Sequence, residues 1–181
     1  RGDSRWVLVD ETFREFTPRR SRAPRGEAGV WTTGTFTKAY GGDPVRVGFV
    51  TAPTEAVDPF AAYHALVTDG LADASVSAAR ALLRDRTAIL DETRRIFLRN
   101  RALLERGLPE VLPVHAPVCF DPIQNSDGTR FARGMLRRSI LVCPGLFFGV
   151  PDGVRLCLTR RSFPADLAAY TAARAHWLRR R

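Results

Sequence analysis

The chain has 181 residues, a formal net charge of +9 and a hydrophobic fraction of 45%. This composition is typical of a globular protein with one core or two small lobes, and it excludes a disordered chain. No run approaches the roughly 20 apolar residues that a membrane span needs, and the first ten residues lack an apolar signal-peptide core. We therefore expect a cytoplasmic protein that makes no membrane contact.

The basic residues do not follow a pattern typical of nucleic-acid binding. They cluster at the carboxyl terminus and in one loop, which holds Arg19, Arg20, Arg22 and Arg25. Elsewhere arginines mostly alternate with acidic residues, and no aromatic side chains interleave with them to stack on bases. We expect no nucleic-acid partner.

Cysteine and histidine spacing predicts no metal site. Cys119, Cys143 and Cys157 each lie in an apolar segment, and we interpret them as buried free thiols. The three histidines, His64, His115 and His176, are scattered along the chain without a ligand motif.

The first part of the chain predicts three strands. Trp6–Val9 is a continuous apolar run ending at Asp10, as in a buried parallel strand with an acid at its carboxyl end. Residues 14–27 are rich in Arg, Pro, Ser and Gly and predict an exposed loop. Val30–Phe36 and Val45–Val50 are the second and third predicted strands.

Helical spacing follows from Pro59 and ends at Gly70. One apolar stripe then runs from Val76 to Gly107, and we expect a single long helix with a charged, solvated face. Such a helix can link two lobes, so we predict a first domain over 1–80, a linking helix over 81–105 and a small domain over 106–181.

The small domain is predicted to be α+β. Its expected elements are a strand within Val111–Ile123, a helix Thr129–Arg138 capped by Asp127, strands Ile140–Val142 and Val154–Leu158, and a final helix Pro164–Leu178.

The stretch Thr35–Phe49, TFTKAYGGDPVRVGF, carries the first candidate site. Lys38 follows the hydroxyl side chains of Thr35 and Thr37, and two glycines then lead to Arg46. An amine, hydroxyls and a guanidinium in a glycine-containing turn can hold one phosphate and one aldehyde. Asp10, at the end of the first strand, adds a carboxylate.

In order and spacing, this set resembles the pyridoxal-phosphate signature of fold-type I, class I/II aminotransferases. VCPGLFFG at 142–149 and GVRLCLT at 153–159 resemble that family's small-domain ending, while SAARALLRD and RNRALLERGL resemble its interdomain helices. The resemblance covers nearly the whole chain. It implies an α/β fold in which part of a mostly parallel large-domain sheet precedes a small α+β domain.

The resemblance also implies roles for the matched residues. Lys38 would hold pyridoxal 5′-phosphate as a Schiff base and then carry the proton between the substrate and the cofactor. Asp10 would keep the pyridine nitrogen protonated, and Thr35 and Arg46 would hold the phosphate. Arg155 would bind the substrate carboxylate with its planar fork.

Two further positions line the implied cofactor site. Thr37 is a weaker phosphate candidate, because the family often has a small residue there. Phe13 stands where the family usually has a tyrosine. Phenylalanine at this position occurs in the branch that resembles histidinol-phosphate aminotransferases and threonine-phosphate decarboxylases.

Members of this family are roughly twice as long as this chain, and the amino-terminal half is the one without a counterpart. The chain is therefore expected to be a fragment of an enzyme, or a truncated homologue that needs a partner, and the family implies a homodimer acting on an amino acid and a keto acid. The alternatives are a decarboxylase of the same fold and a non-catalytic relative.

Overall fold

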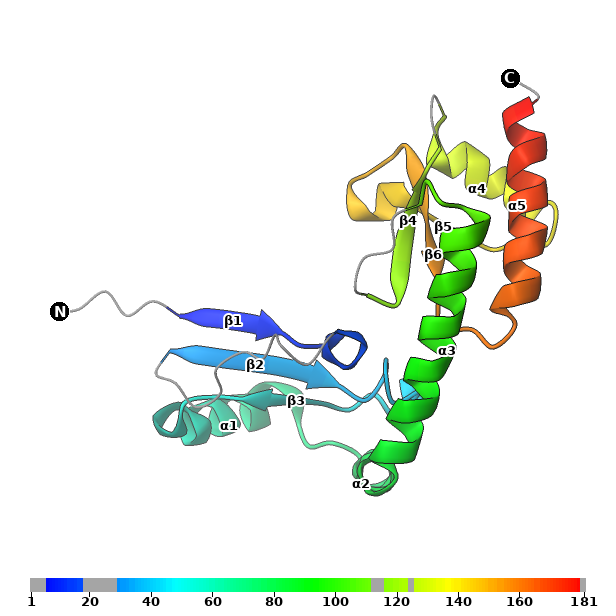
Figure 1. The fold of residues 1–181 in the computed structure, drawn as a ribbon. Helices are drawn as coiled ribbons and strands as arrows, with labels where there is room; N and C mark the ends of the chain where they lie inside the picture. The colour runs from blue at the N-terminus through cyan, green and yellow to red at the C-terminus, as the bar shows by residue number, and fades with distance from the viewer. Residues whose placement is uncertain (1–5, 18–28, 112–115, 124–125, 180–181) are drawn as a thin grey trace. The chain divides into compact units, whose positions relative to one another are not determined.

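The computed structural model describes residues 6–17, 29–111, 116–123 and 126–179 (Figure 1). The chain divides into two compact units, Arg1–Thr93 and Arg94–Arg181. Helix α3, Arg86–Gly107, begins in the first unit and ends in the second. Most of the expected loop over 14–27 lies outside the described residues, and His115 also lies outside them.

The first unit contains a three-stranded sheet in the order β1-β2-β3. Strand β1, Val7–Asp10, pairs in parallel with β2, Val30–Thr35. Strand β3, Gly48–Thr51, is antiparallel to β2. The parallel direction of the first strand and the extent of the second are as predicted. The third strand starts later than predicted, because residues 43–45 form a short 3₁₀ helix instead.

The predicted burial of β1 is wrong for this chain. Leu8 is 70% exposed, and Trp6 and Val7 are exposed too. A continuous apolar run becomes buried only where other elements cover both faces of the strand. Among the described residues, β1 has one strand neighbour, β2.

Helix α1, Thr54–Thr68, starts five residues before the expected position and contains Pro59 within it. It contacts the sheet through Phe60, whose ring centre lies 5.4 Å from that of Trp31 on β2. The helix ends before Gly70, as predicted.

The single helix expected over Val76–Gly107 is in fact two helices. Helix α2, Asp73–Arg84, ends at Asp85, whose backbone leaves the helical region at φ −95° and ψ 10°. The Asp85 N–H still donates to the Ala81 and Leu83 carbonyls, so α3 follows at once. A one-residue break leaves the apolar periodicity almost unchanged, which is why the spacing predicts one helix.

The second unit contains an antiparallel sheet in the order β4-β6-β5. Strand β4 is Val118–Pro122, β5 is Cys143–Pro144 and β6 is Gly153–Cys157. Along β6 and β4 the alternate side chains Val154, Leu156, Cys119 and Asp121 are buried, whereas Arg155 and Cys157 lie on the opposite, exposed face.

Two helices complete this unit: α4, Gly128–Leu136, and α5, Phe163–Arg179. The core is formed by fully buried apolar side chains from α3, α4, β6 and the connecting loops, namely Leu104, Val111, Ile123, Phe131, Met135, Val154 and Leu158. Asp127 caps α4 as predicted, its carboxylate accepting from the Thr129 N–H at 2.7 Å.

The strand predicted at Ile140–Val142 is wrong, because the pairing with β6 begins only at Cys143. Leu141 is 83% exposed and is not part of the strand. The prediction that all three thiols are buried holds for Cys119 only, since Cys143 is half-buried and Cys157 exposed.

A buried polar network joins β4 to α5. The Asp121 side chain is fully buried and accepts from Tyr170 Oη at 2.5 Å and from Arg174 Nε at 2.7 Å. Arg174 also pairs with Glu110 at 2.9 Å. Burial, together with the adjacent Asp121 charge, raises the pKa of Tyr170, so its hydroxyl stays protonated and keeps donating.

None of the helices in the described part of the chain is long and apolar enough to cross a membrane.

Candidate active site

The carboxyl ends of β1 and β2 form the candidate site of the first unit. The two strands are parallel and in register, with Asp10 paired to Thr33, so both end at the same edge of the sheet. Ligands in open α/β sheets bind at this kind of edge. Asp10 is the last residue of β1, and Lys38 lies three residues beyond the end of β2.

Asp10 is exposed, and the turn after β1 holds its side chain. Its carboxylate accepts from the Thr12 N–H at 2.8 Å. Hydrogen bonds from the side chain and backbone of Thr12 hold the pKa of Asp10 below its ordinary value. The carboxylate is therefore ionised at neutral pH and can stabilise a cation.

Lys38 is the only lysine in the sequence. Its side chain is exposed and makes no ion pair or hydrogen bond with any described residue. The two threonines before it are joined, because Thr35 Oγ1 lies 3.0 Å from Thr37 Oγ1 and accepts the Thr37 N–H at 3.1 Å. Within the described part of the chain, the Lys38 amine thus has no partner, and it directly follows a pair of joined hydroxyls in the sequence.

A small core under the loop fixes the position of Lys38. Phe36 and Val47 are buried together with Ala79 of α2, and Phe36 N–H donates to the Val47 carbonyl at 3.1 Å. On the other side of Lys38, the Ala39 carbonyl accepts from Thr93 Oγ1 at 2.9 Å. Buried neighbours thus anchor the backbone on both sides of an exposed lysine.

Arg46 follows the 3₁₀ helix in the left-handed conformation, with φ 54°. A non-glycine residue held there costs roughly 1 to 3 kcal/mol, and such positions cluster at functional sites. Its guanidinium lies 3.6 Å from the Asp43 carboxylate, with both side chains largely exposed. This weak surface pair leaves most of the Arg46 donors available for another anion.

Phe13 begins the short 3₁₀ helix Arg14–Phe16 after β1 and is half-buried. Its ring meets the buried Phe16 ring edge-on at 6.4 Å between centres. This packing explains why an apolar side chain is stable at this position. It also means that Phe13 contributes no hydroxyl to the site.

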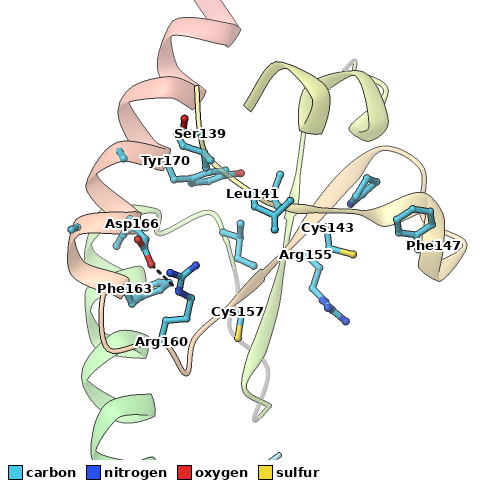
Figure 2. Close-up of a pocket in the computed structure, with 17 residues that line it drawn as sticks. Ser139, Leu141, Cys143, Phe147, Arg155, Cys157, Arg160, Phe163, Asp166 and Tyr170 are labelled. Carbon is cyan, nitrogen blue, oxygen red and sulfur yellow. Dashed lines mark ion pairs between the residues drawn. The ribbon is translucent and has the colours of Figure 1, made fainter. Parts of the chain in front are cut away.

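Arg155 lies on β6 in the second unit. It lines a cavity of about 780 Å³ between β6, the segment before β5 and the start of α5 (Figure 2). The guanidinium carbon stands 4.7 Å from the centre of the Phe148 ring, and Arg155 has no ion pair among the described residues. Arg160, at the same cavity, is paired with Asp166 at 3.4 Å. Arg155 therefore provides the uncompensated charge.

The structure thus brings six predicted site residues into the first unit and leaves Arg155 in the second. Sequence reasoning missed Asn100, which is fully buried and donates to the Leu158 and Arg160 carbonyls at 2.8 Å each. It holds the end of β6 and the loop after it. A lone polar residue in a helix gives no sequence signal for a partner 58 positions away.

Comparison with known families decides the assignment. The family model described as aminotransferase class I and II matches residues 2–162. The chain belongs to this family. A histidinol-phosphate aminotransferase from Symbiobacterium thermophilum is 32% identical over 159 residues, and one from Bdellovibrio bacteriovorus is 28% identical over 168 residues.

The aminotransferase fold is found in solved structures as well. A PLP-dependent aminotransferase from Streptococcus suis matches 94% of this chain with a TM-score of 0.82 at 21% identity. The α/β fold class predicted from the sequence is confirmed. The chain spans about half the length of its relatives, covering 44% and 42% of the two histidinol-phosphate aminotransferases and 49% of the S. suis chain.

Membership of the aminotransferase family implies pyridoxal phosphate as the cofactor. The residues of the first unit fit that group chemically. The amine of Lys38 is free to react with an aldehyde, the Arg46 guanidinium and the Thr35 hydroxyl suit a phosphate, and the ionised Asp10 suits a protonated ring nitrogen.

Proposed function

We propose that this chain is the carboxyl-terminal part of a class I/II aminotransferase that exchanges an amino group between an amino acid and a keto acid. The observation that carries the proposal is the sole lysine of the sequence, which is exposed at the carboxyl edge of a parallel strand pair and has no partner among the described residues. Pyridoxal phosphate, when bound, supplies the ring that accepts electrons from the substrate Cα.

Lys38 is the proposed covalent anchor and proton carrier. Its Nζ accepts the proton that leaves the substrate Cα and would deliver it to the cofactor carbon C4′. The loop core of Phe36 and Val47 supports this role, because it keeps the lysine backbone fixed while the exposed side chain moves.

Asp10, Thr35 and Arg46 are the proposed cofactor contacts. Asp10 stabilises a protonated ring nitrogen, which requires the carboxylate form that its lowered pKa favours. Arg46 neutralises the phosphate charge. The Thr35 hydroxyl, which donates to Thr37 Oγ1 at 3.0 Å in this structure, donates to the phosphate instead, while its oxygen keeps accepting the Thr37 N–H. Phe13 closes one side of the site with an apolar ring.

Arg155 is the proposed carboxylate site for the substrate. The support is its uncompensated charge at a cavity and its contact with the Phe148 ring, which limits the positions that the guanidinium can take. An arginine can bind a carboxylate through two parallel hydrogen bonds, whereas lysine offers a single point charge.

For the whole protein we also propose a homodimer in the cytoplasm that acts on an amino acid and a keto acid. The two curated relatives named above are histidinol-phosphate aminotransferases, so an amino alcohol phosphate is the first substrate to test. The remaining contacts to the cofactor come from an amino-terminal half, either in a longer form of this protein or in a partner chain.

A single-turnover assay tests the proposal. The chain, loaded with pyridoxal phosphate, is mixed with histidinol phosphate or with a panel of amino acids, and formation of the amino form of the cofactor is followed by absorbance. Conversion that disappears in Lys38→Arg and persists in Arg137→Gln, a change at an exposed residue after α4 in the second unit, is the expected result. Release of carbon dioxide without a keto product would instead indicate a decarboxylase.

A further inference from the structure

Two thiols share one face of the second sheet with Arg155. Cys143 is directly opposite Arg155 across the β5–β6 pairing, and Cys157 is two residues further along β6. Residues that are paired across an antiparallel sheet, or two apart on one strand, project from the same face. Cys119, paired with Leu156, projects from the other face.

Cys143, Arg155 and Cys157 all line the cavity of about 780 Å³. Figure 2 shows the two sulfur atoms on either side of the position of Arg155 on its strand. Cys157 is exposed, and its sulfur lies 3.2 Å from the Thr159 hydroxyl. The charged residues that line this cavity are Arg155, Arg160 and Asp166, and Arg160 is paired with Asp166. Arg155 has no ion pair with any described residue, so it carries the uncompensated charge at the cavity.

The register argues against a disulfide between these two cysteines. Cys143 and Cys157 occupy diagonal positions, whose separation in an antiparallel sheet is about 7–8 Å. A disulfide needs its two Cα atoms within about 6.8 Å. Each thiol is therefore placed to react with an external disulfide and not with the other thiol.

We propose that Cys157 is a thiol–disulfide exchange site for small disulfides that carry carboxylates, and that Arg155 attracts them. After its proton is lost to water, the Cys157 thiolate attacks one sulfur of the external disulfide. A new sulfur–sulfur bond forms, the original one breaks, and the other half leaves as a thiolate. Cys157 is oxidised and the external disulfide is the oxidant, so electrons and atoms balance.

The modification places a carboxylate next to Arg155. If Arg155 binds the substrate carboxylate, as the proposed function states, the mixed disulfide competes with substrate. This consequence rests on the proposed function, but the exchange itself does not. The exchange is measured without pyridoxal phosphate, so its failure and the failure of the proposed function are distinguishable.

The chain contains its own unreactive reference thiol. Cys119 is 3% exposed, and burial together with the Asp121 charge raises the pKa of its thiol to about 12. In folded protein near neutral pH it should not react, whereas in denaturant all three thiols should. An unreactive Cys119 in a variant therefore reports that the second unit remains folded.

The test compares two disulfide reagents, the dianionic dithiobis(nitrobenzoate) and the neutral dithiodipyridine, on wild type and four variants. Cys157→Ser and Cys143→Ser identify the reacting thiol. Arg155→Gln removes the proposed attraction, and Arg137→Gln, at the residue after α4, is the control, since it removes one exposed charge that does not line this cavity.

We expect Cys157→Ser to remove the fastest phase of the thiol reaction with either reagent. Arg155→Gln should slow that phase about three- to tenfold with the anionic reagent, an effect that high salt weakens, and leave the neutral rate within about twofold. Three outcomes would overturn the proposal: a fast phase that survives Cys157→Ser, equal slowing by Arg155→Gln and Arg137→Gln, or equal slowing with both reagents.

Discussion

Gly42 lies where the loop after Lys38 turns back toward the core. A Cβ atom there would stand 2.6 Å from Leu82 Cδ1 and 2.8 Å from the Phe36 carbonyl oxygen. The backbone oxygen cannot move without breaking its bond with the Gly42 N–H. The position therefore requires glycine because of close approach.

We expect Gly42→Ala to lower the free energy of unfolding by about 1 to 3 kcal/mol, through overpacking under the lysine loop. Gly70→Ala is the matched control, because its Cβ would meet nothing within 4 Å; its effect should stay within about 0.5 kcal/mol. Urea unfolding measures both. Equal effects would show that the loop adapts to the extra methyl.

Cys119 should make the free energy of unfolding fall at alkaline pH. Its pKa is raised by burial from 9.0 to about 12, so the folded state holds the thiol proton more tightly than the unfolded state. This contribution to stability is fully present below pH 9.0 and is lost as pH rises toward about 12, because the unfolded state releases the thiol proton first.

Between pH 8 and pH 10 the free energy of unfolding should fall by on the order of 1 kcal/mol because of Cys119. Cys119→Ala should flatten the fall in the urea midpoint over this range, while Cys157→Ala, at an exposed thiol, should leave it as in wild type. A wild-type slope in Cys119→Ala would assign the alkaline loss to other groups.

At the scale of elements, the polar network between β4 and α5 cannot be predicted from residues that are neighbours in the sequence. Asp121 is placed inside by strand alternation with Cys119, but its partners Tyr170 and Arg174 are 49 and 53 residues away. Burial alone would lower the pKa of Arg174, and the hydrogen bond and charge of Asp121 raise it on balance.

Arg174→Met should destabilise the protein by about 3 to 5 kcal/mol, because it leaves the buried Asp121 carboxylate without its cation. Glu110→Gln removes only the half-exposed end of the network and should cost no more than about 1 kcal/mol. Thermal or urea unfolding at pH 7 compares the two. A small loss in Arg174→Met would mean that the buried Asp121 side chain does not depend on this cation.

Elements with local signals were predictable from the sequence. The β-rich run Val30–Phe36, the break at Gly70 and the cap at Asp127 each depend on neighbouring residues, and each is observed. The break at Asp85 and the short β5 at Cys143–Pro144 depend on tertiary contacts. Periodicity contains no information about these contacts.

The candidate site was likewise predictable only in part. The order of Asp10, Lys38, Arg46 and Arg155 along the chain can be read from the sequence and predicts one cofactor. The left-handed backbone of Arg46 and the anchoring of Ala39 by Thr93 could not be predicted, since both arise from packing of distant segments.

At the scale of the whole molecule, the proposed cofactor residues Asp10, Lys38 and Arg46 lie in the first unit, and the proposed substrate arginine, Arg155, lies in the second. The chain spans about half the length of each relative named above. The central claim is that the first unit anchors pyridoxal phosphate through Lys38.

Borohydride reduction followed by peptide mass mapping tests this claim most directly. Because Lys38 is the sole lysine, the only other amine that can be trapped is the amino terminus, which separates from it on digestion. We predict a reduced phosphopyridoxyl adduct on the peptide containing Lys38, absent in Lys38→Arg and weakened in Arg46→Gln. A folded wild-type chain with an adduct only at its amino terminus would contradict the account.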